Sequence, residues 1–405
     1  MVVGIIIGAS IFVQPSEINK HVPSIVGVLS VWIAAGVLTL FGALVCAELS
    51  SAFPRTGGVY VFLTETISPA CGFLWGWAMF WSAHSGIIAA SSVIFARYVG
   101  FFAALSDTGI RAVAIAAILV LSFINYLGVR QGSRLQTAVT LSKLVVIAGL
   151  LIMVCIAGKP AAASAAIPAG TTFQEFVLGV SAALFTFGGW HMVTYTAGET
   201  RDPKRTIPKA LVIGSLTVTA CYVALNSAYL YLLPLDRVTS STRVAADAAQ
   251  AIAGPRGAAV VSALVLLSAI GVLNGVILAG PRAYHAMAGD RVSTRLALVV
   301  QAIWSCGLVA TGTYRDLFTR VVYTEWLFFA LMGAGLFRLR ARSGYVPSYA
   351  IWGYPVVPAL FIAASMVVAV ISIAADPWRA ATGLFIVVLG LPVYYIWVRT
   401  RHAHH

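Results

Sequence analysis

The chain has 405 residues, of which 60% are hydrophobic and only 10% are charged. Soluble globular domains carry roughly 25% charged residues, so this composition excludes an ordinary soluble protein and indicates an integral membrane protein. The net charge of +13 would favour a nucleic-acid partner in a soluble protein, but most of the charges stand at the ends of apolar runs, as topology signals do. We therefore expect a lipid bilayer, and no nucleic acid, around this chain.

Apolar segments of about 20 residues, the length that a spanning helix needs, recur along the whole chain. The first of them lacks a preceding basic region, so no cleavable signal peptide is expected. The connecting stretches 53–68 and 236–254 are predicted to be a loop with a short amphipathic piece and a loop helix. The twelve predicted spans are 1–20, 24–52, 70–102, 110–128, 133–157, 173–199, 207–234, 256–288, 296–312, 315–339, 352–374 and 379–398.

The first span is interrupted by Gly8, Ala9 and Ser10, inside the stretch GIIIGASIFVQP. Unpaired backbone groups in hydrocarbon cost several kcal/mol each, so a break persists only where it lines a cavity or binds something. The amino terminus of a half-helix carries partial positive charge and binds anions. We therefore expect the backbone from Ile7 to Ile11 to receive a substrate carboxylate, with glycine-mediated helix packing as the alternative.

A second break, Gly188 and Gly189, interrupts the sixth span inside the stretch LFTFGGWHMVTY. It is predicted to free the carbonyls of Phe185, Thr186 and Phe187, which suit a substrate ammonium. A matching pair of breaks in the two halves of a membrane protein is the best sequence indication of a transporter's substrate site.

Among the ionisable residues inside predicted spans, where charges are expensive and indicate function by default, two have the strongest indications. Lys143, in the fifth span, can release its proton when buried and is predicted to take part in coupling; the alternative is that it extends to the membrane surface. Glu325, in the tenth span, is predicted to receive a cationic side chain or to shuttle a proton. Its alternative is pairing with Arg315 or Arg320 near the surface.

Two further polar residues in apolar segments have weaker indications of function. Glu48, near the end of the second span, is predicted to make a gate or loop contact, with Arg55 as its expected partner. His84, in the third span, is predicted either to line the pathway, where it could titrate near neutral pH, or to pack between helices.

Several of these stretches together resemble one family. They are GIIIGASIFVQP, CAELSSAFPRTGGVYVFLTE, TFGGWHMVTYTAGETRDPKRTIPKA and WLFFALMGAGLFRLR. The chain resembles the amino acid/polyamine/organocation superfamily, and within it the L-type and bacterial amino acid permeases. The resemblance implies two inverted five-helix repeats, about 1–157 and 173–340, with two additional helices at about 352–398. The first and sixth helices of this fold are discontinuous.

The resemblance also implies roles for individual residues. Phe185 matches the position that closes over bound substrate, and Trp190 matches an aromatic residue that shapes the side-chain pocket; packing is the alternative for both. His191 and Glu325 stand where L-type members often have asparagine. Lys143 matches a lysine that lies against the first break, where sodium-coupled relatives hold their ion.

One departure from the family pattern falls at the first break. The usual sequence there is Gly-Ser-Gly, whereas this chain has Gly8, Ala9 and Ser10, so the hydroxyl is shifted by one position. The backbone is therefore the expected carboxylate ligand.

These observations predict a secondary transporter that moves amino acids by alternating access, coupled to protons or to exchange and independent of sodium. The alternative substrate is a cationic amino acid or a polyamine. A channel would need an open pore lined by repeated polar groups, and no catalytic motif supports an enzyme. We expect no cofactor and no metal, because the five cysteines show no ligand spacing.

Basic clusters set the expected orientation. The stretches RDPKR at 201–205 and RLRAR at 338–342 fall on the same side as both termini. Because positive residues accumulate in the cytoplasm, both termini are predicted to be cytoplasmic, in a bacterial inner membrane. The loop 102–110 has no cysteine for a disulfide-linked partner, so no obligatory accessory subunit is expected.

Overall fold

The computed structural model describes residues 2–127, 133–160, 170–288 and 293–402, and every regular element in these ranges is a helix. Nine helices of the described residues are long and apolar enough to cross a membrane. Two shorter apolar helices and the interrupted first segment complete the twelve predicted spans. The prediction of an all-α membrane protein is confirmed.

The helices of the first five spans follow the predicted order, with the first span in three pieces and the short helix α4 in the connecting stretch. Their bounds are α1 (Val2–Ile6), η1 (Ser10–Phe12), α2 (Gln14–His21), α3 (Ile25–Ala52), α4 (Val59–Thr66), α5 (Pro69–Ala78), η2 (Met79–His84), α6 (Ser85–Phe102), α7 (Asp107–Tyr126) and α8 (Ser133–Ala157).

The later spans begin with the second interrupted helix. Their bounds are α9 (Phe173–Phe187), η3 (Trp190–Glu199), α10 (Pro203–Leu232), α11 (Leu235–Ser240), α12 (Val244–Ala288), α13 (Thr294–Thr311), α14 (Tyr314–Arg340), α15 (Val356–Ala375), α16 (Pro377–Val388) and α17 (Gly390–His402).

Side-chain caps fix where several spans begin. The Ser24 hydroxyl accepts a hydrogen bond from the Gly27 amide at 3.1 Å, and Thr172 caps α9 in the same way. Thr313 and Asp316 form a reciprocal capping box at the start of α14. These short polar residues stand at the ends of apolar runs, which is why the predicted and observed bounds agree closely.

Two irregularities modify the predicted spans. The third span contains a π-helical turn, η2, between α5 and α6. Gly254 adopts a positive φ of 63° inside α12, so this helix is kinked near its start. The loop helix predicted within 236–254 therefore consists of α11 and the first turns of α12.

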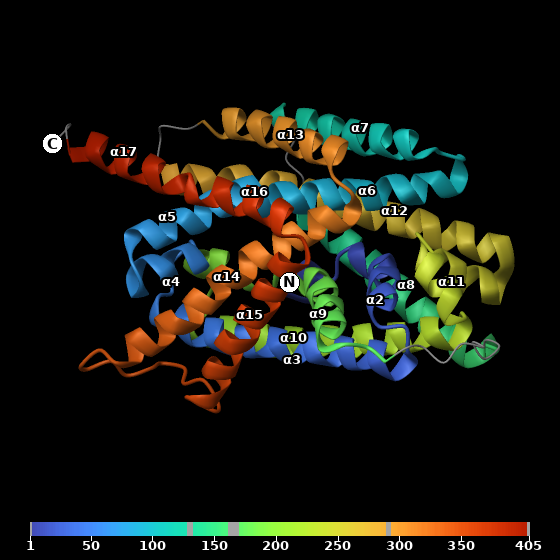
Figure 1. Ribbon diagram of the computed structural model, residues 1–405, viewed down its shortest axis with the longest axis horizontal. Helices are drawn as coiled ribbons and strands as arrows, with labels where there is room; N and C mark the ends of the chain where they lie inside the picture. Colours follow the sequence, from blue (N-terminus) through green and yellow to red (C-terminus); the bar gives the residue numbers. More distant parts are fainter. Residues whose placement is uncertain (1, 128–132, 161–169, 289–292, 403–405) are drawn as a thin grey trace.

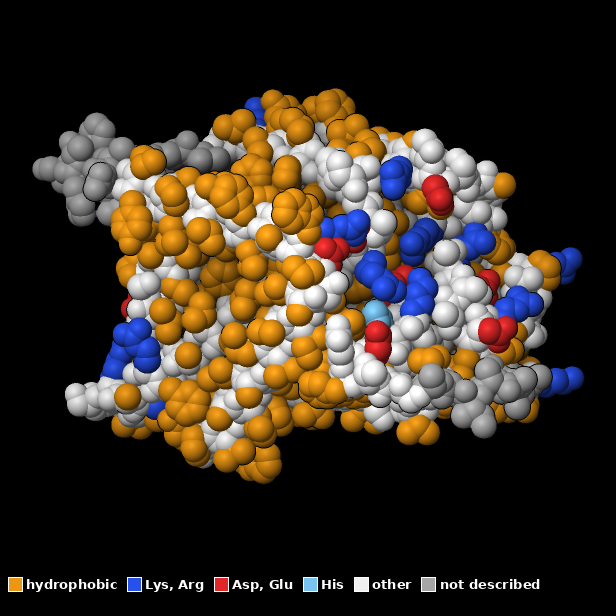
Figure 2. All heavy atoms as spheres, viewed as in Figure 1, with side chains coloured by type: hydrophobic (Ala, Val, Ile, Leu, Met, Phe, Trp, Pro, Cys, Tyr) orange, Lys and Arg blue, Asp and Glu red, His pale blue; other side chains and the backbone are white. Residues whose placement is uncertain are grey.

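The long helices pack side by side in pairs. Figure 1 shows α3 alongside α10, and a Cβ added at Gly36 of α3 would overlap with the Thr219 side chain of α10. The helices α14 and α15 pack together, as do α12 and α6. Apolar side chains cover much of the surface shown in Figure 2, as a bilayer requires.

Candidate functional site

The predicted break in the first span is present. The helix α1 stops at Ile6, and a 3₁₀ turn starts at Ser10. Ala9, Ser10 and Ile11 are buried, and Gly8 is partly buried. A Cβ added at Gly8 would meet nothing closer than the Ser10 hydroxyl, at 3.6 Å, so packing does not require glycine at this position. The missing side chain instead leaves the backbone open to a close approach.

The predicted break in the sixth span follows directly after α9. Gly188 has extended backbone angles, and Gly189 adopts a positive φ of 90°, a conformation that favours glycine. The Gly188 amide donates to the Phe185 carbonyl at 3.2 Å, so this carbonyl already has one partner. The second break, unlike the first, therefore depends on glycine for its backbone conformation.

Tyr222 connects the two breaks. Its hydroxyl, on α10, lies 3.1 Å from the Ile6 carbonyl and 3.2 Å from the Thr186 carbonyl, and it can donate to either. Its ring packs edge-on against Phe187, with 5.0 Å between centroids. The ends of α1 and α9 thus share one hydrogen-bond donor. The sequence reasoning missed this residue, because its only sequence signal is a tyrosine within an apolar span.

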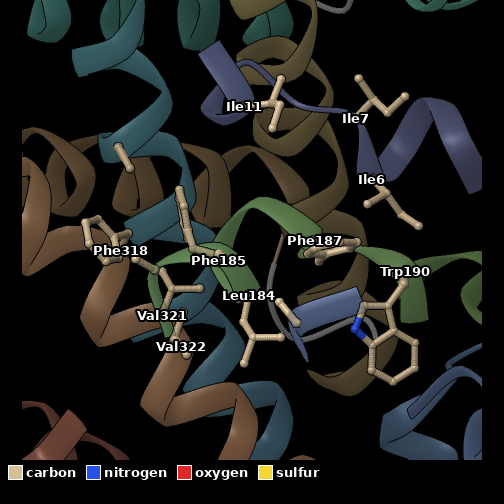
Figure 3. Packing of buried hydrophobic residues seen from close by; sticks show 14 of the residues in the cluster. Ile6, Ile7, Ile11, Leu184, Phe185, Phe187, Trp190, Phe318, Val321 and Val322 are labelled. Atoms are coloured by element: carbon tan, nitrogen blue, oxygen red, sulfur yellow. The ribbon is translucent and has the colours of Figure 1, made fainter. Parts of the chain in front are cut away.

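The aromatic residues of the sixth span lie at different levels along α14. Figure 3 shows Phe185 beside Phe318, and their ring centroids are 5.7 Å apart. Trp190 lies apart from them, 5.0 Å from the Phe329 ring and directly against Gly42 of α3. Both residues therefore face α14: Phe185 lies near the start of this helix, whereas Trp190 lies about three turns further along it and also packs against α3.

The isoleucines of the first break are part of the same buried cluster as these aromatic residues. Ile7 and Ile11 are buried and are drawn above Phe185 and Phe187 in Figure 3. Because the Tyr222 hydroxyl reaches carbonyls of both breaks, the predicted carboxylate and ammonium ends of the site are neighbours in space.

Lys143 is buried against the first span. Its side chain is 2% exposed, and its Nζ lies 3.5 Å from the Gly4 carbonyl of α1. The side chain therefore points to the half-helix before the break and does not extend to the membrane surface.

Glu325 lies in the interior and forms no ion pair with any residue that the structure describes. It is 4% exposed, and its Oε1 has no hydrogen-bond partner within the described structure. The predicted alternative partner Arg315 instead binds Glu17, at 3.0 Å. No ion pair joins Glu325 to Arg320 either. The surface-pairing alternative is therefore wrong.

Glu48 makes a different contact from the predicted one. It is fully buried, and its two oxygens accept hydrogen bonds from Arg340 at 2.7 and 2.6 Å and from the Ile351 amide at 2.7 Å. Arg55 instead pairs with Glu65, at 2.5 Å. The sequence could not supply the partner, because Arg340 lies almost 300 residues further along the chain. We call this group, completed by Tyr345, the Glu48 clamp.

The Glu48 clamp fixes the loop between α14 and α15. The Tyr345 hydroxyl lies 3.5 Å from Glu48, and burial raises the pKa of this phenol to about 12, with the charge of Glu48 adding to the effect. The Arg340 guanidinium also lies 4.0 Å from the centroid of the Tyr354 ring. The loop is therefore held to the ends of α3 and α14 by charged and aromatic contacts.

A cavity of about 550 Å³ opens at the end of the molecule where α9 and α14 begin. Figure 2 shows charged side chains gathered on this part of the surface. Arg379 pairs there with Asp316 and with Asp376, and His21 bonds to Glu175 at 2.5 Å. Phe318, the neighbour of Phe185, also lines the cavity. The inner end of the cavity is therefore close to the second break.

The described residues contain no group of three His, Cys, Asp or Glu side chains placed to hold a metal ion. The arrangement offers instead backbone amides at one break and backbone carbonyls at the other. Two such groups of opposite polarity can hold the carboxylate and the ammonium of one amino acid.

Comparison with known proteins points the same way. A family model described as amino acid permease matches residues 1–397. The chain is 29% identical to a serine/threonine exchanger of Bacillus subtilis, over 98% of this chain and 94% of that protein. It is also 27% identical to the human cystine/glutamate transporter, over 98% and 83%, and 28% identical to the human b(0,+)-type amino acid transporter 1, over 99% and 86%. With both breaks in place and the family model covering almost its whole length, the chain belongs to the amino acid permease family.

Proposed function

We propose that this amino acid permease binds its substrate between the two breaks and transports it by alternating access. The substrate carboxylate is received by the backbone from Ile7 to Ile11, and the ammonium by the carbonyls from Phe185 to Phe187. The observation that carries this assignment is the Tyr222 hydroxyl, which lies within hydrogen-bond distance of both interrupted helices. Phe185 closes the site on the side of the charged cavity.

Transport requires two parts of the chain to move against each other. We assign these parts to the inverted repeats at about 1–157 and 173–340, with the helices at about 352–398 as additions. The short 3₁₀ and extended segments at the breaks provide the places where the backbone can bend.

Coupling is assigned to protons or to exchange, without sodium. The support is Lys143, whose ammonium lies 3.5 Å from the Gly4 carbonyl and places a cation beside the first break. Uptake by Lys143→Ala should lose the pH dependence of the wild type. Wild-type pH dependence in this variant would remove Lys143 from coupling.

A cationic amino acid or a polyamine is the second candidate substrate, favoured by one observation. Glu325 is a buried carboxylate without an ion pair among the described residues, and the side chain of a cationic substrate could supply the missing charge. If Glu325→Gln leaves the uptake of arginine and ornithine into proteoliposomes unchanged, this candidate is dropped.

The proposal is tested by counterflow in sodium-free proteoliposomes that contain only the purified chain. Saturable accumulation of a labelled amino acid, driven by the same unlabelled amino acid inside, is expected. A channel gives no such counterflow. Because no second protein is present, transport in this assay also tests the proposal that no accessory subunit is obligatory.

The remaining assignment concerns location. We propose a bacterial inner membrane with both termini in the cytoplasm, supported by the basic clusters at 201–205 and 338–342. A reporter fused to the C-terminus should be active in the cytoplasm. Activity in the periplasm would show that the orientation is the opposite of the proposed one.

A further inference from the structure

His191 is enclosed by aromatic rings immediately after the second break. Its ring centroid lies 5.6 Å from Trp75, 5.6 Å from Trp190, 5.7 Å from Tyr195 and 5.2 Å from Phe329. The residue is fully buried. Neither ring nitrogen has a hydrogen-bond partner within the described structure.

The ionisable neighbours of His191 come from three elements. His84, at the end of η2, lies within electrostatic range of His191. Tyr195, on η3 itself, lies within electrostatic range of both Glu325 of α14 and Cys46 of α3. We call His84, His191 and Glu325 the histidine centre.

The other elements that pack against η3 add no buried free charge among the described residues, since Lys204, Arg205 and Lys209 of α10 are exposed. The helix α1 has no ionisable side chain. On α10, Tyr222 bonds to the backbone carbonyls of the two breaks. On α4, Glu65 pairs with Arg55, and on α3, Glu48 is saturated by the clamp. Among the side chains that the structure describes, Glu325 is therefore the buried carboxylate that remains for a charge on His191.

An unsatisfied buried polar group costs roughly 1–3 kcal/mol, and such a group in a native structure needs an explanation. The histidine centre has two such nitrogens on His191 and one such oxygen on Glu325. A proton is the ligand that suits this site, since it needs no space beyond the ring that accepts it. Protonation would make both ring nitrogens donors and would place a positive charge among aromatic rings that favour it. Glu325 stands one helical turn before Phe329 on α14, and the Phe329 ring lies 5.2 Å from His191, so the buried carboxylate is on the same side of α14 as that charge.

We propose that the histidine centre is a proton-binding site, in which His191 accepts the proton and Glu325 is its counter-ion. This inference rests on the proposed transport function and adds a site distinct from Lys143. His191 is two residues from Gly189 of the second break, so a charge on its ring acts within the same interrupted helix as the carbonyls assigned to the substrate ammonium. No bond other than the N–H bond to the proton is formed or broken.

The test compares two assays on the same proteoliposomes, with an amino acid that the wild type exchanges. Counterflow at equal pH on both sides needs no net proton movement, whereas accumulation driven by a pH gradient does. The ratio of gradient-driven accumulation to counterflow should fall at least ten-fold in His191→Asn and in Glu325→Gln. The matched control is His21→Asn, a histidine that bonds Glu175 at the surface cavity, and it should keep the wild-type ratio.

Direct proton uptake keeps the inference testable if a variant transports poorly. Between pH 8 and pH 5.5, purified His191→Asn should take up on the order of one proton fewer than the wild type, as expected for the loss of one titrating group. Equal proton uptake, or a wild-type ratio in both variants, would overturn the inference. A wild type that shows counterflow but ignores a pH gradient would overturn the proton site and leave the transport proposal intact. A wild type without counterflow would contradict the transport proposal itself.

Discussion

The Glu48 clamp and the histidine centre are two buried polar groups with opposite degrees of satisfaction. Glu48 is fully buried and accepts three short hydrogen bonds, two of them from one guanidinium. His191 is equally buried and has no hydrogen-bond partner for either ring nitrogen in the described part of the chain. The first group is saturated by the protein's own atoms, whereas the His191 nitrogens and one Glu325 oxygen of the second have no partner among the described residues.

The difference separates a structural role from a functional one. A buried charge contributes to a fold only when the surrounding groups offset its lost hydration, and the clamp meets this condition. An unsatisfied group lowers stability and persists where an activity needs it. Replacing the polar residue should therefore have opposite effects on stability in the two regions.

The largest effect is expected at the clamp. Glu48→Gln leaves Arg340, which is 20% exposed, without its charge partner and should lower the free energy of unfolding by about 3 kcal/mol. The measurement is chemical or thermal unfolding of the purified protein in detergent. Glu65→Gln is the matched control: its pair with Arg55 is solvent-exposed, so its loss should cost at most about 1 kcal/mol. Equal losses of unfolding free energy in the two variants would show that the buried clamp stabilises the fold no more than an exposed ion pair does.

A smaller loss of unfolding free energy is expected at Tyr222, whose hydroxyl is less fully hydrogen-bonded than Glu48 but more so than His191. Tyr222→Phe removes one hydroxyl from the junction of the breaks and should lower the unfolding free energy by about 1 kcal/mol. Because that hydroxyl is the donor that the two half-helices share, substrate affinity should fall as well. The same assays on Tyr229→Phe give the control, since the Tyr229 hydroxyl is buried without a partner in the described structure. An unchanged affinity in Tyr222→Phe would separate this residue from the site.

The smallest effect on stability is expected at the histidine centre. Glu325→Gln removes a buried carboxyl with an unsatisfied oxygen, so the unfolding midpoint should stay unchanged or rise. Unfolding followed by tryptophan fluorescence in detergent measures this midpoint. A fall in the midpoint comparable to that of Glu48→Gln would show that Glu325 has a structural partner. It would contradict the distinction between a saturated clamp and an unsatisfied histidine centre.

Much of this organisation was predictable from the sequence, because apolar length and glycine position are local signals. The twelve spans followed from runs of about 20 apolar residues, and both breaks followed from the glycines that interrupt them. Gly189 illustrates the strength of such a signal, since its positive φ has a local cause.

The contacts between distant residues were not predictable in this way. Arg55 was the expected partner of Glu48 because it is near in sequence, but α14 brings Arg340 to the carboxylate and Arg55 pairs with Glu65. Tyr222 gave no signal for the same reason: its role depends on the packing of α10 against two other helices. The unsatisfied state of His191 is likewise a property of its surroundings and not of its sequence position.

The central claim, that the amino acid is held by the backbone at the first break, is tested most directly by equilibrium binding of a labelled amino acid in sodium-free detergent solution. Gly8→Ala adds one methyl group where the nearest neighbour is 3.6 Å away, so the protein should fold normally. That methyl group would stand in the substrate's place, and affinity should fall at least ten-fold. Gly275→Ala on α12, which meets nothing within 4 Å, should bind like the wild type. Equal affinity of Gly8→Ala and the wild type would contradict a substrate site at this break.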